Sequence, residues 1–227
     1  MSVIELSLAG RGPGRAWVFD HHRFALPCWA EVGPALLITL DRHFDTVPPQ
    51  NPPPRELRGD ELLRWTTEKL DHRNYDHIPA AQHCGVITDA IIVARAKPVG
   101  ARTDFCSAHT LDLISAEWGT PHASPEGKRA HQLVRAAERI VLDVDLDCFT
   151  TPSDADPTTV IPWTRELISD FVMPRGSSDF WNDVLAKCVG FTFAREPNHC
   201  GGLIAGGRLF ETASQVLFVD LLKSDLP

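Results

Sequence analysis

The sequence has no apolar stretch long enough to cross a membrane, and its first residues lack the basic-then-apolar pattern of a secretory signal. It also has little positive charge, with 22 lysines and arginines against 30 aspartates and glutamates and a formal net charge of -8. The cysteines show no CxxC spacing, which argues against a zinc ribbon and a dense disulfide scaffold. These absences predict a cytoplasmic protein with reduced thiols that binds neither nucleic acid nor a membrane. The six cysteines are Cys28, Cys84, Cys106, Cys148, Cys188 and Cys200.

With 227 residues, of which 43% are hydrophobic, the chain can form one domain with a sizeable core, and we expect a single domain over residues 1–227. Apolar strand-like runs alternate with amphipathic ones, which predicts a three-layer α/β/α fold with a mainly parallel central sheet. The expected strands lie near 15–20, 35–41, 87–94, 139–145 and 189–194. The expected helices lie near 57–71, 77–84, 127–138, 164–172, 177–187 and 207–216.

Two acidic segments follow apolar strand-like runs directly. Residues 35–40 run into Asp41, His43 and Asp45, and residues 139–142 run into Asp143 and Asp145. Residues two apart on a strand share a face, so we expect the side chains within each segment to converge. Because the carboxyl ends of parallel strands meet at one edge of a sheet, the two segments together predict a metal centre.

The number of carboxylates indicates how many ions this centre would hold. Asp41, Asp45, Asp143 and Asp145 bring four negative charges, which two divalent cations would balance and one would not. Mainly carboxylate ligands with some imidazole favour a hard or borderline ion, and Mn²⁺ is our first choice. The sequence therefore predicts two Mn²⁺ ions per chain.

A third segment offers another ligand. Residues 17–19 form a short apolar run that leads into Asp20, His21 and His22. We expect His21 to bind metal, with Asp20 and His22 as partners that orient it, because a metal-bound histidine usually donates its other N–H to a neighbouring acceptor.

The segments 41–45 and 143–145 resemble the DxHxD and DxD signatures of the ureohydrolase superfamily, which includes arginases and agmatinases. Asp20-His21 resembles the upstream Asp-His element of that superfamily, and order and spacing agree. The similarity is closer to a divergent branch that includes the peptide arginases, which convert arginine side chains in ribosomally made precursor peptides to ornithine. The segments 74–81 and 192–197 support it.

This resemblance implies an arginase/deacetylase-like fold and a division of the ligands between two ions. Asp41 and Asp143 would bridge the ions. His21 and Asp45 would complete the site of one ion, and His43 and Asp145 that of the other.

The resemblance also suggests residues for catalysis and substrate binding. Glu196, after a late strand, would bind the planar guanidinium through both carboxylate oxygens. His77 is the candidate proton donor to the departing amine, with Asn74 and Asp76 orienting it or contacting substrate. Asp147 would support the turn after the ligand pair without binding metal.

The chain departs from typical arginases because the long loops that hold the α-amino and α-carboxyl groups of free arginine are not found. That favours peptidyl arginine as substrate, with release of urea and a precursor peptide as partner; the oligomeric state stays open, a homo-oligomer included. Two alternatives remain. One is a deacetylase-like amide hydrolase, which would typically use one zinc ion, and the other is a non-catalytic metal-binding protein.

Overall fold

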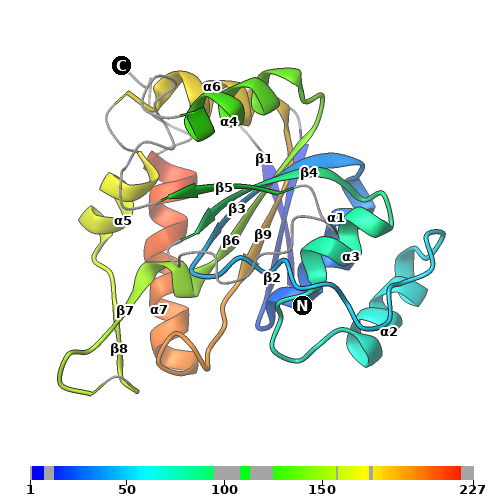
Figure 1. Cartoon of the computed structure of the whole chain (residues 1–227). Coiled ribbons are helices and arrows are strands. Elements are labelled where there is room, and N and C mark those ends of the chain that lie inside the picture. The colour runs from blue at the N-terminus through cyan, green and yellow to red at the C-terminus, as the bar shows by residue number, and fades with distance from the viewer. Residues whose placement is uncertain are drawn as a thin grey trace.

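A seven-stranded sheet forms the centre of the molecule (Figure 1). The computed structural model describes residues 2–7, 13–94, 108–112, 125–156, 158–173 and 176–220. The strand order is β1-β2-β9-β6-β3-β4-β5, and all neighbours are parallel except β1 and β2. The strands are β1 (Ser2–Ser7), β2 (Pro13–Phe19), β3 (Ala35–Asp41), β4 (Ile87–Ala94), β5 (Ala108–Asp112), β6 (Ile140–Asp145) and β9 (Cys188–Ala194).

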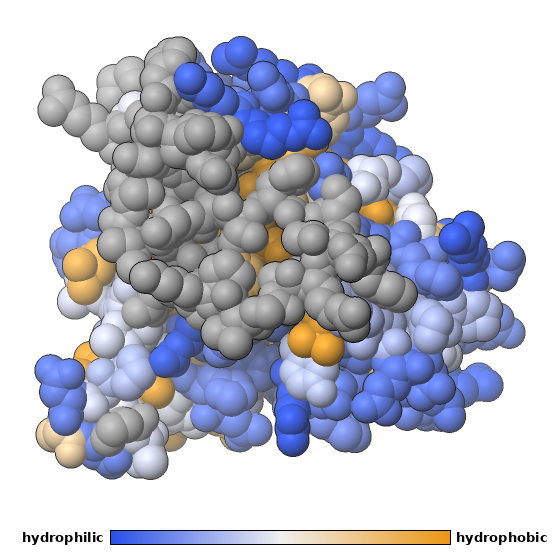
Figure 2. All heavy atoms as spheres, in the orientation of Figure 1, coloured by the Kyte–Doolittle hydropathy of each residue, from blue (hydrophilic) through white to orange (hydrophobic). Residues whose placement is uncertain are grey.

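Helices cover both faces of this sheet. One face packs on α4 (Pro125–Ala136), α5 (Arg165–Val172), α6 (Ser178–Lys187) and α7 (Leu203–Ser214), and the other packs on α1 (Ala25–Val32), α2 (Gly59–Lys69) and α3 (His77–His83). Along β3, Leu36, Ile38 and Leu40 belong to the first core, whereas Ala35 and Leu37 belong to the second. This alternation is the period-two pattern of a strand buried on both sides. Polar side chains cover the outer surface of α2 (Figure 2).

The order of the strands determines where a ligand site can form. From β3 the chain moves outward through β4 and β5, and it then returns to place β6 on the other side of β3. Such a reversal opens a crevice at the carboxyl ends of the two central strands. The carboxyl ends of β2, β9, β6 and β3 lie next to one another at this edge, so the segments that follow them meet there.

The expected fold class is confirmed, and each of the five expected strands and six expected helices is present. The strands at 35–41 and 87–94 have the predicted bounds, and the other elements have shifted bounds. The sequence analysis missed β1, α1, β5 and a short hairpin of β7 (Thr150–Pro152) and β8 (Val160–Pro162). The five cysteines in the described part of the chain form no disulfide with one another, and Cys106 lies outside it. No helix among the described residues is both long and apolar enough to cross a membrane.

Candidate metal centre

Asp41, the last residue of β3, lies at the centre of a buried cluster of carboxylates and imidazoles. Its side chain is fully buried, and its two oxygens face different neighbours. Oδ2 is 3.4 Å from Nδ1 of His22, whereas Oδ1 is 3.7 Å from Nδ1 of His43. One carboxylate therefore connects two groups of potential ligands.

The first group surrounds His22. Its Nδ1 is 3.4 Å from Asp41 Oδ2 and 3.2 Å from one oxygen of Asp45 and of Asp145. Ligand atoms that share one ion at about 2.1 Å are roughly 3.0–3.5 Å apart, so this spacing fits a common cation. His22 Nδ1 and Asp41 Oδ2 are buried and have no hydrogen-bond partner among the described residues. A metal ion would satisfy both atoms.

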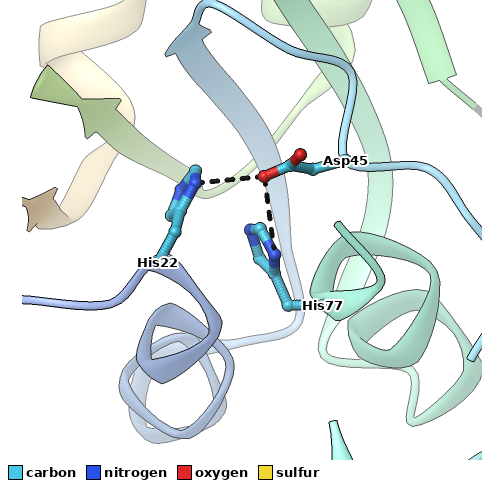
Figure 3. Close-up of side chains that lie close together, drawn as sticks. All are labelled: His22, Asp45 and His77. Atoms are coloured by element: carbon cyan, nitrogen blue, oxygen red, sulfur yellow. Dashed lines mark ion pairs between the residues drawn. The ribbon is translucent and has the colours of Figure 1, made fainter. Parts of the chain in front are cut away.

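His77 completes the surroundings of the first group. Its Nδ1 is 3.8 Å from the same Asp45 oxygen that His22 approaches, and Figure 3 shows both rings directed toward this carboxylate. His22, Asp45 and His77 each offer a ligand atom, and these atoms all lie within 4.8 Å of one another.

The second group contains Asp41, His43 and Asp147. His43 Nδ1 is 3.4 Å from Asp147 Oδ2, and the side chain of His43 is 53% exposed whereas that of Asp147 is buried. Asp147 Oδ1 is buried, and no residue in the described ranges forms a hydrogen bond with it. Asp147 was expected to support a turn, but the structure places it among the candidate ligands.

Asp143 lies deeper in the sheet and is occupied by protein donors. One oxygen accepts hydrogen bonds from Thr39 Oγ1 and His22 Nε2, both at 2.7 Å, and the other accepts one from Thr192 Oγ1. Thr39 and Thr192 are its register partners on β3 and β9, so neighbouring strands direct their hydroxyls to it. Asp143 belongs to none of the ligand groups in the described residues. Because Asp143 already orients His22, we place Asp147 in the ligand set instead.

The roles expected for the Asp20, His21 and His22 segment are also revised. The chain turns after β2, so the fully buried His22 enters the cluster, while His21 is partly exposed and its ring lies 6.4 Å from that of Phe24. Asp20 Oδ1 accepts a hydrogen bond from Arg195 Nε at 2.8 Å and forms an ion pair with Arg195 Nη2 at 2.7 Å, and so it supports neither histidine. The geometry places His22, and not His21, in position to bind metal.

Burial and mutual repulsion shape the ionisation of this cluster. Burial, together with the charge of a neighbouring aspartate, raises the pKa of Asp45 and of Asp145 well above the ordinary value. Burial, with the charge of Asp41, raises the pKa of Asp147 to about 7. Burial lowers the pKa of His22, but the surrounding carboxylates outweigh it and the net pKa is raised. Each raised pKa means that the side chain keeps its proton to a higher pH, because the cluster lacks positive charge. A divalent cation would supply that charge in place of the protons.

A cavity of about 630 Å³ opens beside the cluster. The acidic residues Asp45, Asp145, Asp147 and Glu196 line it, as do Val47 and Pro48, which follow Asp45 in the chain. Glu196 is 3% exposed, and its Oε1 accepts hydrogen bonds from the His22 backbone N–H at 2.6 Å and from Asn74 Nδ2 at 2.7 Å. The described residues direct no hydrogen bond to its Oε2.

The residues expected to work with Glu196 lie in different places. Asn74 lines the cavity, as a substrate-contacting residue should, but Asp76 and His77 are not on its wall. Asp76 is buried and accepts the backbone N–H of Asp71. His77 Nδ1 bonds the carbonyl of Asn74, and burial lowers its pKa well below the ordinary value. His77 is thus badly placed to give a proton to a molecule in the cavity.

The sequence analysis missed His199, an exposed imidazole on the cavity wall three residues after Glu196. Its backbone N–H bonds the carbonyl of Glu196 in the turn that follows β9. A lone histidine in a Gly-rich turn carries no signal of its own in a sequence, and only the short distance along the chain from Glu196 could have indicated it.

The structure is similar to solved ureohydrolases, at low sequence identity. Arginase from Entamoeba histolytica, in complex with L-ornithine, aligns over 90% of this chain and 69% of its own, with 16% identity and a TM-score of 0.48. Arginase from Bacillus subtilis aligns over 93% of this chain and 73% of its own, with 14% identity and a TM-score of 0.47. The agmatine ureohydrolase of Thermoplasma volcanium aligns over 90% of this chain and 64% of its own, with 14% identity and a TM-score of 0.41. No protein-family model matches this sequence, and no curated protein matches it either. A likeness at this level assigns neither a family nor an activity.

Proposed function

We propose that the chain is a hydrolase with two Mn²⁺ ions that converts peptidyl arginine to ornithine and releases urea. The observation that carries the proposal is the position of the Asp41 carboxylate. Its two oxygens face two groups of buried ligands beside a cavity with an acidic end. Such an arrangement fits two cations that share one bridging ligand.

The ligand set follows from the distances. His22, Asp45 and Asp145 would hold one ion, and His43 and Asp147 would hold the other, with Asp41 shared. Oxygen and imidazole ligands of this kind suit Mn²⁺. Two bound divalent ions supply an activated water at neutral pH.

The residues of the chain would then bind and orient the substrate. Glu196 would bind the guanidinium, because His22 and Asn74 hold one of its oxygens while it lines the cavity. Water adds to the guanidinium carbon, the bond from this carbon to Nε of the arginine side chain breaks, and urea leaves. The remaining nitrogen takes up a proton and becomes the amine of ornithine. We assign proton delivery to His199, because it lies on the cavity wall and His77 does not.

The shape of the cavity supports a substrate with more than one residue. At about 630 Å³ it exceeds the volume of an arginine side chain, and the exposed apolar Val47 lies on its wall with Pro48. Apolar groups at this position suit the flank of an extended peptide better than the charged α-amino and α-carboxyl groups of free arginine.

The test is incubation of the Mn²⁺-loaded protein with arginyl peptides, with free arginine and with acetyl-lysyl peptides. We expect urea from the peptides, together with the mass loss of a guanidine-to-amine conversion, at a rate at least tenfold above that for free arginine. Faster turnover of free arginine would contradict the peptide substrate. Release of acetate in place of urea would favour a deacetylase-like enzyme, and metal uptake without any product would favour a binding protein.

A further inference from the structure

Arg23 is a buried cation for which the described residues provide no ion-pair partner. It follows His22 in the chain, and the residue is only 8% exposed. The guanidinium lies over the ring of Phe24, with its carbon 5.3 Å from the ring centroid. Nε is buried and receives no hydrogen-bond acceptor from the described part of the chain. Glu196, Asp76 and Asp71 are near enough to act on its charge, but it forms no ion pair with any carboxylate in the described residues.

The one side-chain hydrogen bond of Arg23 within the described residues leads to the cavity. Nη1 lies 2.5 Å from Nδ1 of His72, and His72 lines the cavity beside Arg73. An arginine always donates, so His72 Nδ1 must accept and its Nε2 must carry the proton. His72 thus connects the Arg23 guanidinium to the wall of the cavity where the proposed substrate would bind.

A buried guanidinium that lacks an acceptor for most of its N–H groups is costly, and native proteins normally provide a partner for such a group. A guanidinium whose donors are not all used favours a carboxylate as its partner. We propose that Arg23 and His72 form a carboxylate-binding subsite, and that the substrate carries a carboxylate close to its guanidinium. The inference rests on the proposed function, since it deepens the choice of substrate.

Two sources could provide this carboxylate. One is an aspartate or glutamate next to the arginine in a peptide, and the other is the α-carboxylate of free arginine. The lining of the cavity includes the acidic residues Asp145, Asp147 and Glu196 as well as His72 and Arg73. A molecule with a positive and a negative end fits this distribution in either case.

Four substrates distinguish the sources. Three are capped peptides without terminal charges, with arginine flanked by alanines, preceded by aspartate or followed by aspartate, and the fourth is free arginine. We expect kcat/KM for one aspartyl peptide to exceed that for the alanyl peptide about 10- to 100-fold, mainly through KM. The same advantage for free arginine alone would assign the subsite to the α-carboxylate.

The variants Arg23→Gln and His72→Ala test the residues. Each should lower the ratio of kcat/KM for the carboxylate-bearing substrate to kcat/KM for the neutral substrate at least tenfold. The control Arg129→Gln, on the exposed face of α4, should leave this ratio unchanged. If Arg23→Gln does not fold, His72→Ala decides, because His72 is exposed. A wild-type ratio near one, or a ratio that persists in the variants that fold, would overturn the subsite.

A failure of the proposed function would look different. If no substrate yields urea, calorimetric binding of the same peptides to the Mn²⁺-loaded protein replaces turnover. One of the two aspartyl peptides should then still bind at least tenfold more tightly than the alanyl peptide, and His72→Ala should remove this difference in affinity. Equal binding of both peptides to the wild type would refute the subsite independently of any catalysis.

Discussion

Asp143 and Asp147 should respond in opposite ways to the loss of their charge. Asp143→Asn should destabilise the protein with or without metal, because this carboxylate accepts hydrogen bonds from Thr39, Thr192 and His22 within the sheet. Asp147→Asn should stabilise the metal-free protein and weaken metal binding, because this carboxylate has a buried oxygen without a partner and borders the cavity. The two substitutions are isosteric, so packing is nearly unchanged in both.

The contacts set the size of each effect. An asparagine at 143 would lose its charge and oppose donors with its own N–H₂ group, at a cost of about 3–5 kcal/mol. For a chain of this length that corresponds to an unfolding temperature lower by roughly 6–20 °C. Burial raises the pKa of Asp147 to about 7 from 3.8, so its ionisation at pH 8 destabilises the metal-free fold by up to about 4 kcal/mol. Asp147→Asn removes this cost.

The assay is thermal unfolding at pH 8 with a chelator and with Mn²⁺, combined with elemental analysis. Wild-type protein and Asp154→Asn, a control at an exposed position, should bind two ions and gain stability from them. Asp147→Asn should bind fewer than two ions and should unfold above the wild type in chelator. The reasoning would be refuted if Asp143→Asn kept the wild-type unfolding temperature and lost its ions while Asp147→Asn retained both.

Three further predictions concern the same site. Glu196→Gln should keep both ions but lose about 2–4 kcal/mol of transition-state stabilisation, or roughly 30- to 1000-fold in kcat/KM; near-normal turnover would exclude Glu196 as the guanidinium anchor. His199→Asn should lower kcat at unchanged metal content, and an unchanged kcat would show that the proton comes from elsewhere. Without metal, the unfolding temperature should fall between about pH 4 and 9, because the folded state holds two protons more tightly than the unfolded state does. Asp147, with its pKa raised by burial from 3.8 to about 7, accounts for the fall up to about pH 7. His43, with its pKa raised by Asp41 from 6.5 to about 9, accounts for the fall from about pH 6.5 to 9. Mn²⁺ should remove this fall, and a curve of equal slope with Mn²⁺ would show that ions do not replace those protons.

The sequence could locate the site because strand-end positions follow from simple patterns. Apolar runs before Asp41 and Asp143 marked β3 and β6, and the parallel order brought their ends together. The register within the second segment could not be read in the same way, since Asp143, Asp145 and Asp147 alternate without interruption. The strand ends at Asp145, whose side chain accepts the Asp147 N–H, and a 3-10 turn follows at Leu146–Phe149. Asp143 thus lies two residues, or about 6.6 Å, inside the sheet.

The missed elements lacked the signals on which the sequence analysis relied. α1 has only eight residues, includes Pro27 and buries Leu26, Cys28 and Trp29, so it shows no clear polar face. Its position nevertheless matters for the site. Trp29 Nε1 donates to Thr192 Oγ1, and Thr192 in turn donates to Asp143. Hydrogen bonds thus connect α1 to His22 through Thr192 and Asp143. These contacts form only in the folded protein, so no local sequence pattern could predict them.

Backbone strain gives an independent indication that this site is functional. In the described part of the chain, the non-glycine residues with positive φ are Asp45 (46°), Asn74 (61°) and Glu196 (37°), and all three line the cavity. Such conformations cost on the order of 1–3 kcal/mol each, most for a residue such as glutamate. The three are held by contacts within the site, since Asn74 bonds Glu196 and the Asn74 carbonyl bonds His77, which approaches Asp45. Glycine would adopt these conformations without strain. Here the positions instead carry two carboxylates and an amide on the cavity wall, which is the expected result if this edge of the sheet binds metal and substrate.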